Sequence, residues 1–287
     1  MTSCFFASDL HGDVSRYGKL IAAIENETPD IVLLGGDLLP PFLDSSDGDT
    51  HSDSGFIDGF LRRQFLFLKS SLGQNYPAVF IIPGNDDPKS EEESLEHAGR
   101  DGLWANIQGR VIQMGNYAFA GYAFIPPTPF RLKDWERYDV SRFVDPGCTP
   151  PEEGTLTTNA DRRELSRRTI QNDLEILGRG MDFSKTVFLF HSPPYDTYLD
   201  RAALDGKMFD SAPLDVHVGS IAIKRFLEKT QPLISLHGHV HESAELSGSW
   251  KELIGRTHCF GAAHAGPELA LVRFNLEDPA AASRDLL

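Results

Sequence analysis

Short apolar runs alternate with helical patterns along the first third of this 287-residue chain. Runs of strand length occupy residues 2–8, 30–34 and 78–82. Between them, residues 14–27 and 56–72 repeat apolar side chains at the spacing of one helix face. The order strand, helix, strand, helix, strand predicts a mainly parallel sheet with helices on its faces, which is an α/β fold.

The alternation continues along the rest of the chain, with longer interruptions. Asp13 is interpreted as the N-cap of the first helix. Residues 110–114 and 117–124 are predicted strands, joined by a hairpin turn at Gly115-Asn116. The remaining predicted elements are helices over 161–178 and 218–229 and strands over 186–190, 232–236, 257–262 and 268–275.

Composition excludes several classes of function. The chain holds 27 Lys and Arg against 42 Asp and Glu, a net charge of −15, so a nucleic-acid polymer is not an expected partner. No apolar stretch approaches the roughly 18 residues of a membrane-spanning helix. The three cysteines lie far apart and form no CxxC pair, and the first residues lack a basic leader, so a cytoplasmic location is predicted.

The predicted parallel strands each stop at a side chain that can bind a metal. The carboxyl ends of such strands share one crevice, so these groups are expected to converge. Carboxylate, amide and imidazole donors suit Mn, Fe, Co, Ni or Zn. The strand ends carry Asp9-Leu10-His11, Gly36-Asp37, Gly84-Asn85-Asp86-Asp87, His191 and Gly238-His239-Val240-His241.

The spacing within these motifs is consistent with a shared site. Asp9 and His11 are two residues apart, so in an extended strand end both point to one face, and His239 and His241 repeat this spacing. Glycines such as Gly36 and Gly84 let the backbone turn sharply and approach bound ions closely.

Taken in order, the motifs resemble the signature of the calcineurin-like metallophosphoesterases, which reads D-x-H, G-D, G-N-H-[DE], H and G-H-x-H. The resemblance extends from residue 2 to about residue 262. The ending Gly-His-Val-His-Glu-Ser is similar to the bacterial and archaeal predicted phosphoesterases related to cyclic-nucleotide phosphodiesterases.

The resemblance implies a four-layer α-β-β-α sandwich of two mixed β-sheets flanked by helices. It also implies a metal-dependent phosphoesterase with two divalent ions, Mn²⁺ favoured and Fe, Zn, Co or Ni as alternatives. A water or hydroxide bridging the two ions would be the nucleophile. The implied ligands are Asp9, His11 and His241 for the first ion and Asn85, His191 and His239 for the second, with Asp37 bridging both and so sharing in catalysis.

One residue departs from the family signature. Asp86 stands where the family carries a His that is thought to protonate the leaving group. An aspartate with a pKa of about 3.9 is a poor proton donor at neutral pH unless its surroundings raise that pKa. Bound metals would oppose such a rise, whereas neighbouring carboxylates would favour it. Asp86 is therefore either a weak catalytic acid or unnecessary for substrates with good leaving groups.

The expected substrate is a phosphodiester or a small nucleotide-type phosphate ester. The alternatives are a phosphomonoesterase and a non-catalytic binding or assembly module with the same fold. A protein Ser/Thr phosphatase is disfavoured, because the run Gly36-Asp37-Leu38-Leu39-Pro40 lacks the Arg of G-D-x-x-D-R-G. The oligomeric state is not predicted.

A single domain over residues 1–287 is predicted, with insertions at about 40–56 and 125–160. The first is an acidic loop without the ligand ladder of a calcium site. Within the second, residues 129–138 mix cations with aromatics and form either a cap over the site or a packed surface excursion.

The remaining candidates receive structural interpretations. Asp87 is expected to orient a neighbouring ligand. His237 is interpreted as a packed strand residue, and His217, His258 and His264 as structural or surface groups. The small-residue loop that holds His264 is also a candidate border of the site.

Overall fold

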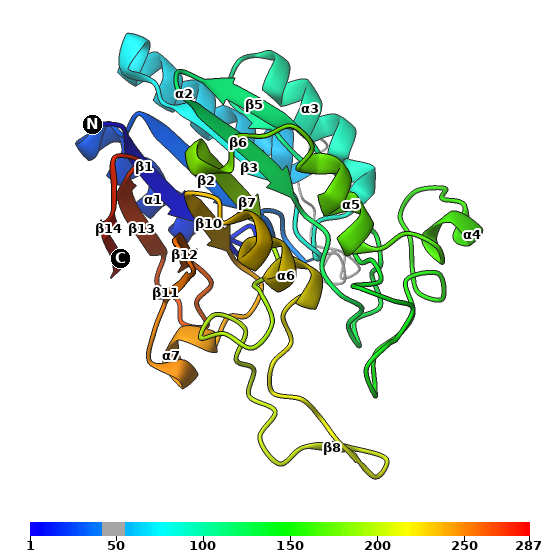
Figure 1. Ribbon diagram of the computed structural model, residues 1–287. Helices are drawn as coiled ribbons and strands as arrows, with labels where there is room; N and C mark the ends of the chain where they lie inside the picture. Colours follow the sequence, from blue (N-terminus) through cyan, green and yellow to red (C-terminus); the bar gives the residue numbers. More distant parts are fainter. Residues whose placement is uncertain (42–54) are drawn as a thin grey trace.

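Two six-stranded sheets pack face to face between two layers of helices (Figure 1). The computed structural model describes residues 1–41 and 55–287. The strand order is β14-β13-β1-β2-β3-β4 in the first sheet and β11-β12-β10-β7-β6-β5 in the second. Both sheets mix parallel and antiparallel pairs, so the expected four-layer sandwich of two mixed sheets is confirmed.

The first sheet is parallel at its centre. Its strands are β1 (Ser3–Ala7), β2 (Ile31–Gly35), β3 (Ala78–Ile82), β4 (Ala105–Asn106), β13 (Ala270–Asn275) and β14 (Asp278–Leu286). β1 pairs parallel with β2, and β2 pairs parallel with β3, so their carboxyl ends lie at one edge of the sheet. The antiparallel strands β13 and β14 complete one side.

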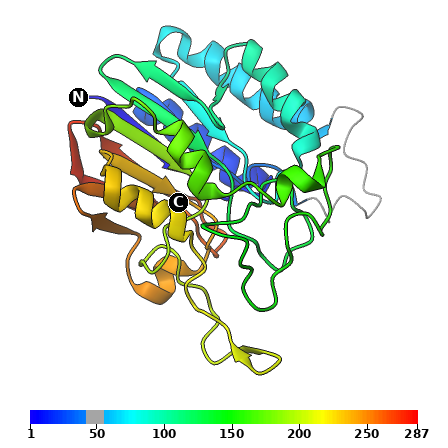
Figure 2. The ribbon, with the colours of Figure 1, turned by 45° about the vertical axis from the view of Figure 1, so that its right-hand side comes forward.

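The second sheet also has a parallel centre. Its strands are β5 (Val111–Met114), β6 (Tyr117–Tyr122), β7 (Thr186–Phe190), β10 (Ile234–His237), β11 (Lys251–Ile254) and β12 (Thr257–Gly261). β7 pairs parallel with both β6 and β10. A separate hairpin of β8 (Met208–Phe209) and β9 (Ala212–Pro213) projects away from both sheets (Figures 1 and 2).

Helices cover the outer faces of both sheets. The helices are α1 (Val14–Glu27), α2 (Arg62–Leu72), α3 (Glu92–Arg100), α4 (Arg162–Leu165), α5 (Ile170–Leu177), α6 (Ile221–Thr230) and α7 (Ser243–Ser247). A π-helical turn over Ile57–Leu61 runs directly into α2. Within residues 1–41 and 55–287, no helix has the length and apolar character that crossing a membrane requires.

Alternation along the strands separates two apolar layers. In β1, Phe5 packs in the layer beneath α1 and α2, whereas Phe6 faces the second sheet. The two sheets meet through pairs such as Phe80 on β3 and Phe119 on β6, whose ring centroids lie 5.0 Å apart. Burying each such side chain contributes roughly 1.5–3 kcal/mol, so this core fixes the sheet edges that carry the site.

Local sequence signals predicted α1 well and the helix after residue 160 poorly. Asp13 accepts hydrogen bonds from the N–H groups of Ser15 and Arg16, which confirms it as the N-cap of α1. The prediction of one helix over 161–178 was wrong, because α4 ends at Leu165 and α5 begins at Ile170. Thr169 is extended and caps α5 through the N–H of Asn172, so a new helix starts there.

Of the two predicted insertions, only the one at 125–160 lies wholly within the described residues. Most of the acidic segment 40–56 lies outside the described residues, which resume at residue 55. In the segment 125–160, the chain forms turns and isolated bridges such as Ile125 with Glu136. The single-domain organisation stays a prediction.

Candidate metal centre

The turns that follow the central strands hold strained backbone conformations. Asp9, His11, Asp37 and His239 have φ values of 58°, 47°, 50° and 71°. Such left-handed conformations are uncommon for residues other than glycine and cost on the order of 1–3 kcal/mol each. All four residues belong to the set predicted from the sequence to hold metals. The strain is therefore concentrated where the carboxyl ends of the strands meet.

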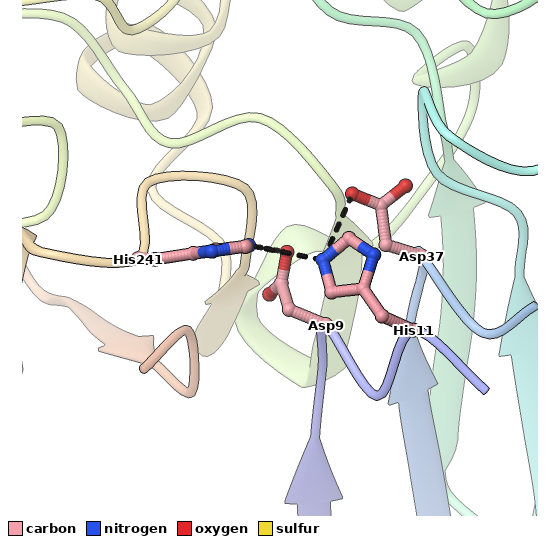
Figure 3. Close-up of side chains that lie close together, drawn as sticks. All are labelled: Asp9, His11, Asp37 and His241. Atoms are coloured by element: carbon pink, nitrogen blue, oxygen red, sulfur yellow. Dashed lines mark hydrogen bonds and ion pairs between the residues drawn. The ribbon is translucent and has the colours of Figure 1, made fainter. Parts of the chain in front are cut away.

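One cluster contains Asp9, His11, Asp37 and His241, whose side chains point toward one another (Figure 3). His11 Nε2 lies 3.1 Å from His241 Nε2 and 3.8 Å from Asp37 Oδ2. His241 Nε2 lies 3.3 Å from Asp9 Oδ1. One donor atom from each residue lies within 4.8 Å of the others, so a small inward shift would let all four contact one cation at bonds of about 2.0–2.2 Å.

A second group adjoins the first. His191 Nε2 lies 3.0 Å from Asn85 Oδ1 and 3.3 Å from Asp37 Oδ2. His191 Nδ1 lies 2.7 Å from the carbonyl oxygen of Gly35, so this nitrogen donates its proton there and Nε2 is the ring nitrogen presented to Asn85 and Asp37. The Asn85 amide nitrogen donates to Asp86 Oδ1 at 3.0 Å, which leaves the amide oxygen for the site.

Asp37 and His239 connect the two groups. Asp37 Oδ2 faces His11 on one side and His191 on the other, and the carboxylate is buried. His239 places its ring 5.3 Å from that of His191, centroid to centroid. Its backbone N–H donates to both carboxylate oxygens of Asp9, at 3.0 and 3.1 Å. The fold thus brings all seven predicted ligand residues to one edge of the sheets.

Two glycines leave the room that this convergence needs. A Cβ on Gly84 would lie 2.2 Å from Asp37 Oδ1 and 2.7 Å from His191 Cε1. A Cβ on Gly36, whose φ is +98°, would lie 2.6 Å from His191 Nδ1. Any side chain at either position would push the Asp37 and His191 groups apart.

The imidazoles and carboxylates shift one another's pKa values in opposite directions. Burial opposes ionisation of Asp9 and Asp37, but the neighbouring imidazoles outweigh it and hold the pKa of both carboxyls below their usual range. Burial likewise lowers the pKa of His191, yet Asp37 outweighs it and raises that pKa to about 10. The positive charge of protonated imidazole thus balances the buried carboxylates. Bound divalent cations would displace these protons and supply the positive charge instead.

Asp86 lies beside the cluster. Its Oδ2 is 3.6 Å from His11 Nδ1, and its backbone N–H donates to Asp37 Oδ1 at 2.8 Å. Burial, and then the charge of Asp37, raise the pKa of Asp86 to about 6. Its carboxyl side chain is 36% exposed, so it can reach a bound ligand.

Asp87 braces two of the ligand-bearing loops. Its buried carboxylate accepts hydrogen bonds from the N–H groups of Leu38, Leu39 and Gly84. These bonds tie the loop after Asp37 to the loop that carries Asn85. Trp135 adds a third contact, because its indole N–H donates to the Asp87 carbonyl oxygen at 2.9 Å.

Several cations and aromatics of residues 129–138 are used in contacts within the protein. Lys133 and Glu136 form a fully buried ion pair at 2.6 Å. Arg137 lies 3.6 Å from the centroid of the Phe124 ring and pairs with Asp173. These contacts fit the packed alternative, and the capping role stays a prediction carried by the exposed Phe130.

The four histidines interpreted as structural or surface groups have partners outside the ligand set. His237 is buried between Ser235 Oγ and the Ser192 carbonyl oxygen and stacks on Phe190. The remaining three histidines contact other side chains. His217 Nδ1 lies 2.8 Å from Asp200 Oδ1, His264 Nε2 lies 3.0 Å from Glu268 Oε2, and His258 packs beside Phe260.

Sequence reasoning missed Arg16, which contacts the backbone of a site residue. Its guanidinium donates to the Asp9 carbonyl oxygen at 2.7 Å. The only local signal is a cation in the first turn of α1, where the helix dipole disfavours positive charge.

Comparison with known proteins gives a family match over most of the chain. The sequence profile described as calcineurin-like phosphoesterase matches residues 4–243. One solved structure is 15% identical with a TM-score of 0.62, and the match covers 99% of this chain and 98% of the other. TT1561 of Thermus thermophilus is also 15% identical, with a TM-score of 0.57 and coverage of 99% and 98%. The similarity to these two structures concerns the fold. The comparison with curated proteins found no match.

Proposed function

Because this chain belongs to the calcineurin-like phosphoesterase family and is a metal-dependent phosphoesterase, we propose that it hydrolyses phosphodiesters or small nucleotide-type phosphate esters with two divalent cations. The observation that carries the proposal is the position of Asp37. Its Oδ2 lies 3.8 Å from His11 Nε2 and 3.3 Å from His191 Nε2, so one carboxylate reaches both ligand groups. A carboxylate in this position suits a bridge between two neighbouring ions.

The chemistry of the donors fits such a pair of cations. Asp9, His11 and His241 would hold the first ion, and Asn85, His191 and His239 the second, with Asp37 between them. Oxygen and nitrogen donors in this mixture suit Mn²⁺, Fe, Zn, Co or Ni, and Mn²⁺ is the ion that the family resemblance favours. When bound, two such ions supply positive charge to the phosphoryl oxygens and acidify the attacking water. They also offset locally the net charge of −15, which otherwise repels a phosphate.

The protein's own residues would prepare the reaction. The Gly35 carbonyl orients His191, and the Asp87 carboxylate holds the loops of Asp37 and Asn85 together. Asp86 would give its proton to the leaving-group oxygen: burial and the charge of Asp37 favour this by raising its pKa, whereas the bound ions would oppose it. The proposed location is the cytoplasm, and the proposed organisation is one domain.

The test is a Mn²⁺-supplemented screen of purified protein with four substrates: bis-p-nitrophenyl phosphate, p-nitrophenyl phosphate, a cyclic nucleotide and a nucleoside diphosphate. We expect faster hydrolysis of the diester than of the monoester. Asp37→Asn should lower kcat/KM more than about 100-fold, because even residues that only orient metal ligands typically cost 10–100-fold. Glu228→Gln, an exposed carboxylate on α6, is the matched control and should be unchanged.

The alternatives give different results in the same screen. Hydrolysis of the monoester alone would overturn the diester preference in favour of a phosphomonoesterase. Bound Mn²⁺ without hydrolysis of any substrate would favour a binding or assembly module. Full activity of Asp37→Asn would overturn the two-ion proposal itself.

A further inference from the structure

Asp9 depends on three polar contacts to keep its left-handed conformation. The residue is fully buried, and its φ is 58°. Its N–H donates to the Gly36 carbonyl oxygen at 3.0 Å, and its carboxylate accepts the N–H of His239. Asp9 lies beyond the end of β1, so its buried carbonyl oxygen needs a donor outside the strand ladder, because an unpaired buried carbonyl is costly.

Arg16 provides that donor. Its Nη1 donates to the Asp9 carbonyl oxygen at 2.7 Å, and its Nη2 donates to the Gly266 carbonyl oxygen at 2.5 Å. Within residues 1–41 and 55–287, no other hydrogen bond reaches the Asp9 carbonyl. Gly266 lies in the connection from β12 in the second sheet to β13 in the first. The guanidinium thus joins the Asp9 turn to a connection between the two sheets.

Neither the helix nor an ion pair explains an arginine at this position. Arg16 lies in the first turn of α1, where the helix dipole disfavours a cation. No carboxylate of the described residues lies within 4.0 Å of its guanidinium, and its Nε is buried without a partner. What the side chain does provide is a planar fork in which two separate nitrogens each donate to a different carbonyl oxygen, whereas a lysine has one donor nitrogen.

We propose that Arg16 is a positioning residue for the first metal ion. By holding the Asp9 carbonyl, it keeps the Asp9 turn left-handed and the carboxylate beside His241. Without it, the peptide after Asp9 is free to rotate and the turn relaxes toward negative φ. The carboxylate then moves away from His241 Nε2, from which it is now 3.3 Å distant. This inference rests on the proposed function, in which Asp9 is a ligand of the first ion.

The test measures Mn²⁺ binding to the full-length chain by calorimetry and by electron paramagnetic resonance. Wild-type protein should bind two ions and give the spectrum of a coupled pair. Arg16→Gln should weaken one binding step at least about 10-fold, as expected when an orienting contact to a ligand is lost, and give an isolated-ion spectrum at low loading. Arg16→Lys should show intermediate affinity, because a single ammonium nitrogen replaces the two nitrogens with which Arg16 holds the two carbonyls.

Lys19→Gln is the matched control, since Lys19 lies on the same helix but donates to the carbonyl oxygen of Leu287. It should bind both ions as the wild type does. Wild-type affinity for both ions in Arg16→Gln would overturn the inference alone. So would an equal loss of both binding steps, which indicates a general loss of structure. Absence of Mn²⁺ binding by the wild type would overturn the proposed function and the inference with it.

Discussion

At the site, neighbouring groups determine which atom of a ligand side chain faces the metal centre. His191 offers Nε2 to the centre because its Nδ1 faces the Gly35 carbonyl, and Asn85 offers its oxygen because its nitrogen donates to Asp86. For these two ligands, the orientation is therefore set by a neighbour that is not itself a ligand. Substitutions of those neighbours are expected to change affinity and rate without removing a donor.

Asp86 is the residue whose chemistry departs most from the family signature. If Asp86 protonates the leaving group, Asp86→Asn should slow phenyl esters at least 10-fold more than p-nitrophenyl esters, because general acid catalysis typically contributes 10²–10⁴-fold where protonation is needed. Asp86→His should speed hydrolysis of the phenyl esters. The measurement is kcat/KM for matched pairs of diesters with the two leaving groups. An equal loss of rate on both esters would show that Asp86 is not the acid.

At the scale of elements, the site is built from loops rather than from the strands themselves. The strands fix where each loop begins, and contacts such as those of Asp87 with Leu38 and Gly84 fix how the loops lie against one another. Glycine is required where two loops approach most closely. In the interior of a helix, by contrast, glycine is a cost, because it loses more conformational freedom on folding than other residues.

Two glycine substitutions compare a glycine that close loop contact requires with a glycine on an open helix surface. Gly84→Ala should lower the free energy of unfolding by more than about 2 kcal/mol and weaken Mn²⁺ binding, because its Cβ would lie 2.3 Å from the Asp37 backbone nitrogen. Gly18→Ala on α1 should raise the free energy of unfolding by about 0.5–1 kcal/mol, since a Cβ there meets nothing within 4 Å. Urea denaturation measures both. A Gly84→Ala variant with wild-type stability and Mn²⁺ affinity would contradict the assigned loop geometry.

Over the whole molecule, the sequence allowed the architecture and the location of the site to be predicted, but not the contacts that hold the site in place. Strand ends such as those before Asp37 and His191 could be predicted because each buried strand is an uninterrupted apolar run. The polar side chain that follows such a run marks where the strand ends. The break before Thr169 was missed because both neighbouring segments keep a helical pattern. Arg16 was missed because its second partner, Gly266, lies 250 residues away in the sequence.

The central claim is that seven side chains from five loops hold two cations on either side of one carboxylate. Crystals grown with Mn²⁺ and measured at the manganese absorption edge test this most directly. We predict two anomalous peaks about 3.5–4 Å apart, with Asp37 between them. Asp9, His11 and His241 should surround one peak, and Asn85, His191 and His239 the other. A single peak, or peaks bound by other residues, would contradict the account.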